Sequence, residues 1–582
     1  MPKKADPNKI STRIIKSKRP NGDTYVYERR SRYIQEKRYE VSIGKKLLGV
    51  IKKGSTEMTP TRSKRPSAKK PSEPAAESKQ MGLSEILDWI GRESGIDEDV
   101  RAAFGSDKGG ADKVISLARY ATATVRQPTA LFNTWQMSHN VPYEDPIGED
   151  SVRNLYNYIG CHADIVQTYF KSRASRMPDG DCTIFDSTTM STDSLLQPEA
   201  RKGFNKAGDG KDTIKYASFL SMKTRQPIAF AREPGNIPDV LAMRSAIKSL
   251  DFLGLRAKLL VTDNGYCSDT NILDLCRSGV HFLTMERSNV NWVKNEIEPK
   301  ISDLMLFTNI LKSDKKVHGI TLKVRHEFSW KAKYTTKKYE SGDERKHAYN
   351  LYIHAYRSED SIARDQAKLD SRLCELKEQL ESGVKDFTAG AQAWIDKFLV
   401  VSHDNGRTVV EPNKAEYEKA CRYLGVFVLV SNSIKDCEEA LVTYRRREEI
   451  EAHFRLGKQK GRLSHPHVWH PQTLEGRLFC MFVALGYETF LQERMRQAEE
   501  KLGKENGDPH HDLKGTLEAE NKLRAWMQNS TFEEILTWFD CVREVTVKTK
   551  TGKLRWSTAL VNRDRMFLKT IGYPVRDNER AF

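Results

Sequence analysis

The sequence predicts an α/β protein whose mixed sheet is covered by helices. Two short apolar runs, CTIFD at 182–186 and AKLLVT at 257–262, predict buried strands, and an aspartate stands at the end of each. Further strand-like and helix-like segments alternate between and after these runs as far as residue 286. Strands followed by alternating strands and helices are typical of a mixed sheet with helices packed on its faces.

The N-terminal 80 residues carry most of the net positive charge. The 582-residue chain has a net charge of +17, and residues 1–80 contain 22 Lys and Arg but 8 Asp and Glu. Such an excess is typical of a protein that binds a polyanion, most often nucleic acid, although an unstructured basic tail is the alternative. Alternating residues around the turn dipeptide Asn21-Gly22 predict a basic β-element over 1–53. A composition rich in Pro, Ser and Lys predicts a flexible linker over 54–80.

The basic element presents cations interleaved with tyrosines. We expect DNA contacts from Arg29, Arg30, Arg32, Lys37, Arg38, Lys45 and Lys46. Aromatic and cationic side chains on one sheet face can follow a nucleic-acid backbone, and the available tyrosines are Tyr25, Tyr27, Tyr33 and Tyr39. The same tyrosines fit a small hydrophobic core equally well.

The remaining chain divides into five predicted segments. Apolar residues at three- and four-residue spacing predict a helical domain over 81–178, and the pattern of strands and helices described above occupies 179–290. Residues 291–443 are rich in predicted strands and contain a charged helix. Residues 444–500 are strongly helical, and 501–582 form a C-terminal region with helices and a basic hairpin.

Composition excludes several classes of protein. The nine cysteines are scattered without a CxxC pair, which favours free thiols in a reducing compartment over a disulfide framework or a cysteine zinc site. No apolar run approaches 18 residues and the N-terminus lacks the apolar core of a signal peptide. We therefore expect a cytoplasmic protein without a membrane partner. The histidines of SHPHVWH (His465, His467 and His470) match no standard zinc spacing, and the prolines beside them indicate a loop.

The segment YRRREEIEAHFRLGK at 444–458 predicts one helix with a polar stripe. On a helix with about 100° per residue, four of its side chains fall within an arc of roughly 60°. These are Tyr444, Arg447, Glu451 and Lys458. A carboxylate between cations suits a site that holds a metal ion beside phosphates, while a solvated helix with i,i+4 ion pairs is the alternative.

Two strand-end aspartates supply partners for Glu451. Asp186 and Asp263 each follow an apolar run, at the carboxyl end where open α/β sheets place their sites. If the two strands are neighbours, the three carboxylates converge. Such oxygen-only clusters favour Mg²⁺ or Mn²⁺. A strand-end aspartate can also form a turn or cap a helix.

Together these motifs resemble those of a known family. The spacing of Tyr444, Arg447, Glu451 and Lys458 resembles the Y-R-E-K signature of bacterial DDE-type insertion-sequence transposases, in the superfamily named after insertion sequence four. FDSTT and VTDNGY resemble the motifs around the first and second aspartates of that family, and LEGRLFCMFVALGYE resembles its following helix. Asn264 departs from the family, because many relatives carry a basic or small residue there.

The resemblance implies a fold and a function. It implies a ribonuclease-H-like catalytic core in two parts, 179–290 and 444–500, with 291–443 as a β-rich insertion. The implied activity is cut-and-paste DNA transposition from terminal inverted repeats, by a nucleoid-associated bacterial protein that synapses two ends as a homodimer or larger oligomer.

The resemblance also implies roles for individual side chains. Two Mg²⁺ (or Mn²⁺) ions would be held by Asp186, Asp263 and Glu451. Arg447 and Lys458 would neutralise phosphates, and Tyr444 would donate a hydrogen bond to one. Trp330 is a candidate for stacking on a flipped base, with core packing as its alternative.

Two other functions fit the same sequence. A ribonuclease-H-like nuclease would cut DNA without strand transfer, and a regulator with an inactive core would bind DNA without cutting it. The presence of three carboxylates argues against the second.

Overall fold

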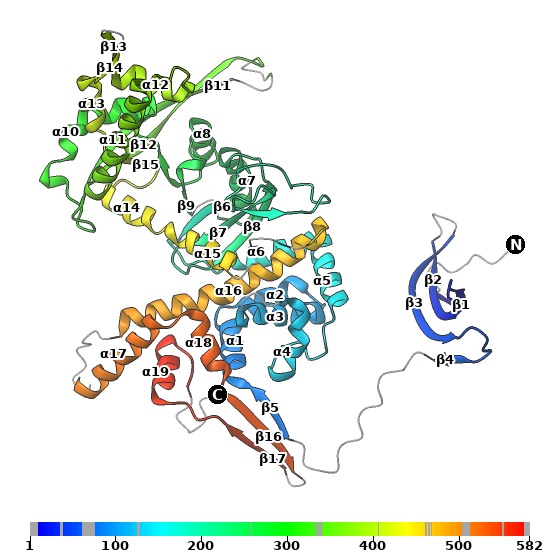
Figure 1. Ribbon diagram of the computed structural model, residues 1–582. Coiled ribbons are helices and arrows are strands. Elements are labelled where there is room, and N and C mark those ends of the chain that lie inside the picture. Colours follow the sequence, from blue (N-terminus) through cyan, green and yellow to red (C-terminus); the bar gives the residue numbers. More distant parts are fainter. Residues whose placement is uncertain are drawn as a thin grey trace. The chain divides into compact units, whose positions relative to one another are not determined.

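The computed structural model consists of two compact units (Figure 1). It describes residues 10–34, 39–60, 76–124, 128–255, 258–331, 335, 340–404, 407–459, 463, 466, 468–502, 513–549 and 552–575. One unit comprises Met1–Glu77 with Val545–Arg555, and the other comprises Ser78–Glu544 with Trp556–Phe582. This division is coarser than the seven predicted segments, whose boundaries stay predictions.

The N-terminal unit contains the predicted basic β-element as an antiparallel sheet. Its strands are β1 (Ile10–Lys18), β2 (Thr24–Ile34), β3 (Tyr39–Ile51) and β4 (Met58–Pro60), in that order. The predicted turn joins β1 to β2, where Gly22 adopts φ 87° and donates its N–H to the Arg19 carbonyl. Strand β4 lies within the stretch 54–80 that is predicted as a linker.

The second unit is built on a mixed sheet of eight strands. Their order is β11-β12-β15-β10-β9-β6-β7-β8, with β9 parallel to both β6 and β10 and the other pairs antiparallel. Their bounds are β6 (Cys182–Thr192), β7 (Asp212–Ser221), β8 (Pro227–Pro234), β9 (Leu259–Thr262), β10 (Phe282–Glu286), β11 (Val317–Lys331), β12 (Glu344–Ser358) and β15 (Val426–Ser431). The mixed α/β class is therefore confirmed.

The segment 291–443, predicted as a β-rich insertion, shares its long strands with the central sheet. Its strands β11, β12 and β15 continue the central sheet, with β15 pairing antiparallel to β10. The physical reason lies in β15, whose sequence VFVLVS has no polar face and requires cover on both sides. The first part of the segment is helical, with α9 (Asn291–Ile297) and α10 (Ile301–Leu304).

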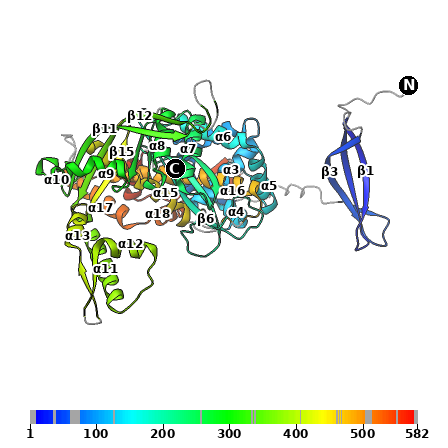
Figure 2. The same cartoon turned by 90° about the horizontal axis from the view of Figure 1, so that it is seen from above.

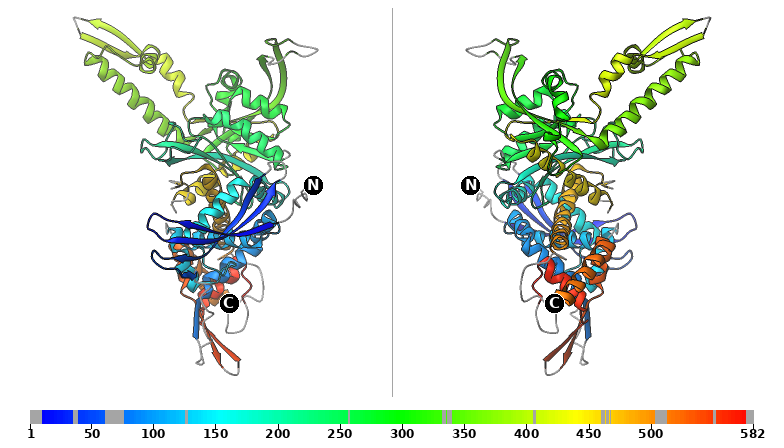
Figure 3. Two further views of the ribbon diagram at one scale, coloured as in Figure 1. Left: turned by 90° about the vertical axis from the view of Figure 1, so that its right-hand side faces the viewer. Right: turned by 90° about the vertical axis from the view of Figure 1, so that its left-hand side faces the viewer.

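The rest of that segment forms an arm with a small core of its own (Figures 2 and 3). Its elements are α11 (Glu359–Glu381), α12 (Ala389–Phe398), β13 (Leu399–Asp404), β14 (Arg407–Pro412) and α13 (Lys414–Cys421). The leucines of α11 pack within the arm, where Leu376 is buried against Ile395 and Val410. The yellow-green elements in Figure 3 extend away from the central sheet.

Helices from both ends of the unit cover the central sheet. The N-terminal set is α1 (Met81–Glu93), α2 (Ile96–Phe104), α3 (Lys108–Ala123), α4 (Phe132–Ser138), α5 (Glu149–Cys161) and α6 (Ala163–Ser175). Between β8 and β9 lies α7 (Asp239–Phe252), and α8 (Asp269–Arg277) precedes β10. Helix α16 (Pro471–Lys501) is buried through its apolar centre and packs against α3 and α5.

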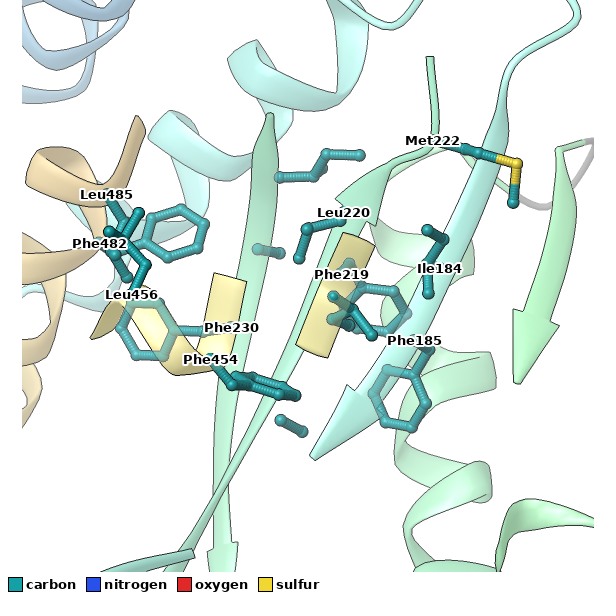
Figure 4. Packing of buried hydrophobic residues seen from close by; sticks show 14 of the residues in the cluster. Ile184, Phe185, Phe219, Leu220, Met222, Phe230, Phe454, Leu456, Phe482 and Leu485 are labelled. Atoms are coloured by element: carbon teal, nitrogen blue, oxygen red, sulfur yellow. The ribbon is translucent and has the colours of Figure 1, made fainter. Parts of the chain in front are cut away.

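Two glycines allow α5 and α16 to approach closely. A Cβ added to Gly160 would lie 2.0 Å from the Gln472 carbonyl oxygen, and one added to Gly476 would lie 2.0 Å from that of Tyr156. Figure 4 shows Phe482 of α16 beside Phe230 of β8, with a ring-centroid distance of 5.2 Å. The helix following the family-like signature is thus anchored in the core.

The C-terminal region contains the predicted helices and hairpin. Its elements are α17 (Leu513–Asn529), α18 (Phe532–Asp540), β16 (Arg543–Thr549), β17 (Gly552–Ser557) and α19 (Asn562–Ile571), and β5 (Ala76–Gln80) adds a third strand to the hairpin. All nine cysteines are free thiols. Within the described residues, every helix is too short or too polar to cross a bilayer.

Candidate active site

Asp186 and Asp263 lie in step on two parallel strands. Strands β6 and β9 pair in parallel with Ile184 opposite Val261, and each aspartate comes two residues after its member of that pair. Parallel strands advance together, so the two carboxylates reach the same edge of the sheet. The sequence predicts that Asp186 stands at the end of its strand. It lies within β6 instead, because β6 continues to pair with β7 through Thr192.

Asp263 caps a helical turn, which is the structural alternative to metal binding for an aspartate at a strand end. Its Oδ1 accepts a hydrogen bond from the Asn264 N–H at 2.8 Å and caps the short 3₁₀ turn Asn264–Tyr266. The same oxygen accepts a hydrogen bond from the Tyr444 hydroxyl at 3.0 Å. The cap and the tyrosine hold this carboxylate in one orientation, and its Oδ2 faces Arg447.

The prediction of one continuous helix from Tyr444 to Lys458 is wrong. Helix α14 (Cys437–Arg445) ends after Tyr444, and α15 (Glu448–Gln459) begins after Arg447. Three backbone hydrogen bonds at the break span three residues rather than four, and their donors are the N–H groups of Arg447, Glu449 and Ile450.

The charges around the break favour two helix ends. Helix α14 ends with Arg445, and the first turn of α15 contains Glu448, Glu449 and Glu451. Basic side chains at a helix C-terminus and acidic ones at an N-terminus are each stabilised by the helix dipole. The four signature residues therefore come from two helices and the turn between them.

Arg447 contacts all three predicted carboxylates. Its Nη1 lies 3.4 Å from Asp186 Oδ2 and 3.7 Å from Asp263 Oδ2, while its Nη2 lies 3.0 Å from Glu451 Oε1. The guanidinium side chain is 13% exposed and that of Glu451 is 54% exposed. The break after α14 makes this possible, because it turns Arg447 toward the sheet edge.

The three carboxylates surround a guanidinium instead of forming a tight cluster. Among the described residues, no three His, Cys, Asp or Glu side chains are arranged closely enough to hold a metal ion. The donor chemistry nevertheless fits a hard cation, because the oxygens of Asp186, Asp263 and Glu451 face one cleft. Direct coordination by all three would require Arg447 to withdraw from between them.

A cleft of about 650 Å³ opens in front of these side chains. Cationic and anionic side chains both line it. The cations beside the carboxylates include Lys206, Lys215, Lys458 and Arg447. Burial raises the pKa of Asp186 to about 6, although the Ser187 N–H at 2.7 Å and Arg447 oppose that shift. Burial and the neighbouring Lys206 lower the pKa of Lys458. The cleft therefore combines acceptors for a cation with donors for an anion.

The arrangement coincides with a known domain. The family model described as Transposase DDE domain matches residues 177–485, which is more than half of the chain. The chain belongs to this transposase family. The matched range contains every predicted catalytic and supporting residue from Asp186 to Lys458.

Similarity to individual proteins is weaker than the match to the family model. No curated protein matches this transposase. Among solved structures, it is similar to the cryo-EM structure of the piggyBac transposase synaptic complex with hairpin DNA, at 10% sequence identity and a TM-score of 0.33. The match covers 78% of this chain and 81% of that chain.

Four side chains of this transposase site were not predicted from the sequence. Lys215 on β7 donates to Asp239 Oδ1 at 2.6 Å, and the Ser187 hydroxyl donates to the same oxygen at 3.1 Å. The Tyr266 hydroxyl lies 3.4 Å from Asp186 Oδ1. A lysine within the otherwise apolar run TIKYASFLSM is the one signal that could have indicated Lys215, whereas Asp239 reads as an ordinary first residue of a helix.

Other predicted site residues of the transposase lie elsewhere. Trp330 is partly buried against the core with the Arg277 guanidinium 5.1 Å from its ring centroid, which fits the packing alternative. His470 is exposed before α16, while His465 and His467 lie outside the described residues. Of the predicted DNA contacts, Arg29, Arg30, Lys45 and Lys46 lie on β2 and β3. Lys37, Arg38 and the side chain of Arg32 lie outside the described part of the chain.

Proposed function

We propose that this protein is a Y-R-E-K-type DNA transposase that binds the terminal inverted repeats of its element and catalyses Mg²⁺-dependent phosphodiester hydrolysis and strand transfer. One observation carries the proposal: Asp186 and Asp263, in step on parallel strands, face Glu451 across a cleft that also contains Arg447 and Lys458. Family membership supports the same conclusion.

The carboxylates have the chemistry to hold divalent ions. Asp186, Asp263 and Glu451 would hold two Mg²⁺ or Mn²⁺ ions. When bound, these ions supply an activated water or 3′-hydroxyl for in-line attack on a phosphodiester. Tyr444 already donates to Asp263, so we assign it to positioning that carboxylate rather than to a phosphate.

The cations suit an incoming phosphate. Arg447 offsets the repulsion among three carboxylates in the described structure, and a phosphate is a competing anionic partner for its planar donors. Lys458 lies in the same cleft, and the Lys206 ammonium donates to the Ser187 carbonyl at 3.3 Å. We infer that DNA draws Arg447 toward the scissile phosphate and frees the carboxylates for the cation.

We infer that β8-β7-β6-β9-β10 form the ribonuclease-H-like core implied by the resemblance. Three antiparallel strands followed by two that run parallel to β6 support this assignment. Strands β15, β12 and β11 then extend the core sheet on the side of β10.

Mutation of the three carboxylates tests the proposal. We expect Asp186→Ala, Asp263→Ala and Glu451→Gln each to abolish Mg²⁺-dependent cleavage of DNA carrying the inverted repeats that flank the gene, while DNA binding is retained. A gel assay with labelled end DNA measures both properties. Undiminished cleavage by any of the three variants would refute the assignment.

Two further measurements separate the alternatives. Products joined to a target through a supplied 3′-hydroxyl end distinguish a transposase from a nuclease that only cuts. Binding of the end DNA by the wild type without any metal-dependent cleavage would instead support the inactive regulator. Co-retention of two differently labelled copies on paired end DNA tests the proposed homodimer or larger oligomer.

A further inference from the structure

Three cations of the N-terminal sheet form one row across three strands. Arg13 on β1 stands opposite Arg29 on β2, and Arg29 stands opposite Lys45 on β3. Residues directly opposite each other on antiparallel strands point to the same face and have Cβ atoms about 5 Å apart. We call Arg13, Arg29 and Lys45 the cationic row.

The row is costly for the sheet itself. Like charges directly opposite each other destabilise a strand pair, and here the repulsion is repeated across two pairs. On the described positions of the same face, the neighbouring rows contain Ser11 with Ser31 and Ile15 with Tyr27 and Leu47.

The opposite face of the sheet is different. There Lys46 stands opposite Glu28, whose carboxylate also lies 3.8 Å from Arg30. Ile14, which stands opposite Glu28 from the other side, is apolar and 66% exposed. Cations on the two faces therefore differ in surroundings, although the sequence presents them as one continuous basic segment.

The tyrosines beside the row orient a cation. The Lys45 ammonium lies 3.9 Å from the centroid of the Tyr27 ring, and the Tyr25 ring is stacked beside Tyr27 at 6.4 Å. An ammonium over the ring is held there by cation–π attraction, and it covers a face on which a base would stack. This favours contacts with phosphates over contacts with bases.

We propose that the cationic row binds the phosphate backbone of double-stranded DNA. Three strands about 4.8 Å apart make the row roughly 10 Å long, which covers about three phosphate-to-phosphate steps of one strand at 3.4 Å of helix axis each, so each of the three cations can meet a phosphate. The inference rests on the proposed function for its partner, DNA, but not for catalysis. Of the DNA contacts expected from the sequence, it retains Arg29 and Lys45 and excludes Arg30 and Lys46. It adds Arg13, which was not among them.

A pair of charge-matched variants tests the proposal in the full-length protein. The row variant carries Arg13→Gln, Arg29→Gln and Lys45→Gln, and the control variant carries Lys16→Gln, Arg30→Gln and Lys46→Gln on the opposite face. Binding to a fluorescent 30-base-pair duplex without inverted repeats is measured in EDTA at several salt concentrations. We expect the slope of log K against log salt to become shallower by about 2.7 in the row variant, because each lost phosphate contact changes it by about 0.9. The control variant should keep the wild-type slope.

Several outcomes would overturn the proposal. Equal loss in both variants would mean that net charge alone matters, and an unchanged slope in the row variant would mean that the row does not contact DNA. A larger loss on an RNA duplex than on DNA would assign the row to RNA instead. Because the assay contains no metal, a protein that binds through the row but never cleaves DNA would refute the proposed function and leave this inference intact.

Folding is controlled in the same experiment. Removing like charges should leave the row variant at least as stable as the wild type, which thermal unfolding measures. If the triple variants unfold, Lys45→Gln is compared with Lys46→Gln, for which slope changes of about 0.9 and zero are expected.

Discussion

The larger unit, Ser78–Glu544 with Trp556–Phe582, contains two clusters of arginines and carboxylates that differ in burial and pairing. In the structural cluster, Arg119 lies 2.7 Å from Asp97 and Arg173 lies 3.0 Å from Asp99, and all four side chains are at most 4% exposed. In the cleft cluster, one guanidinium serves three carboxylates at 3.0 to 3.7 Å, and the carboxylates are between 16% and 54% exposed.

The difference separates a buried, fully paired ionic network from one that is open to another partner. Each carboxylate of the structural cluster has an arginine of its own, and the Tyr487 hydroxyl also donates to Asp97. The network joins α2 and α3 to α6 and α16. The cleft cluster has fewer cations than anions and faces solvent, so it can accept a cation or exchange its guanidinium for another partner.

The largest expected effect separates activity from stability in the cleft. Asp263→Asn keeps the shape of the side chain but removes a charge that the proposed metal site requires. We expect DNA cleavage to fall by at least about 10³-fold, or about 4 kcal/mol in the activation barrier, while the urea midpoint is unchanged or higher. A variant that cleaves within tenfold of wild type would remove Asp263 from the catalytic set.

Removing a carboxylate from the structural cluster should lower the stability of the fold. Asp97→Ala leaves the buried Arg119 without its closest carboxylate. Breaking a buried pair in this way typically costs about 3–5 kcal/mol of unfolding free energy, which urea unfolding measures. Asp112→Ala, in an exposed pair with Arg101 at 3.2 Å, is the matched control and should cost less than about 1 kcal/mol. Similar losses in both variants would contradict the distinction between the clusters.

A pH dependence follows from the burial of Asp186. Its folded-state pKa of about 6 lies above the ordinary value of 3.8, so the folded protein binds this proton more tightly than the unfolded chain. The stabilisation from protonated Asp186 is present below about pH 4 and is lost as the pH rises to about 6. In EDTA, Asp186→Asn should therefore gain up to about 3 kcal/mol relative to wild type above pH 6 and little at pH 4. If the difference in unfolding free energy between Asp186→Asn and wild type does not change with pH, the raised pKa of Asp186 is refuted.

The smallest expected effect concerns orientation in the cleft. Tyr444→Phe removes the hydroxyl that donates to Asp263 but keeps the buried ring. Loss of a hydrogen bond to a ligand typically weakens metal affinity by about 10- to 100-fold, which titration calorimetry with Mn²⁺ measures. Tyr423→Phe, between α13 and β15 and outside the cleft lining, serves as the control. If Tyr444→Phe binds Mn²⁺ as tightly as wild type, Tyr444 does not position Asp263 for the metal, and donation to a phosphate becomes the better assignment.

Local patterns identified much of the fold and of the site. The apolar runs before Asp186 and Asp263 predict buried strands because a strand covered on both faces leaves a continuous hydrophobic signal. Similarly, the long helix after residue 471 follows from its length and apolar centre. The spacing of Tyr444, Arg447, Glu451 and Lys458 indicated the family without requiring the correct helix bounds.

What the sequence by itself determined is the DDE transposase family, the mixed α/β class and five of the residues that line the cleft, namely Asp186, Asp263, Arg447, Glu451 and Lys458. Tertiary structure decided the helix break at Arg447, the pairing of Lys215 with Asp239, the continuation of the sheet through β15, and the alignment of Arg13, Arg29 and Lys45. The physical reason is that these features depend on strand register and on contacts between distant segments. A shift of one residue in register would move each cation of the row to the other face, and composition is identical for both registers.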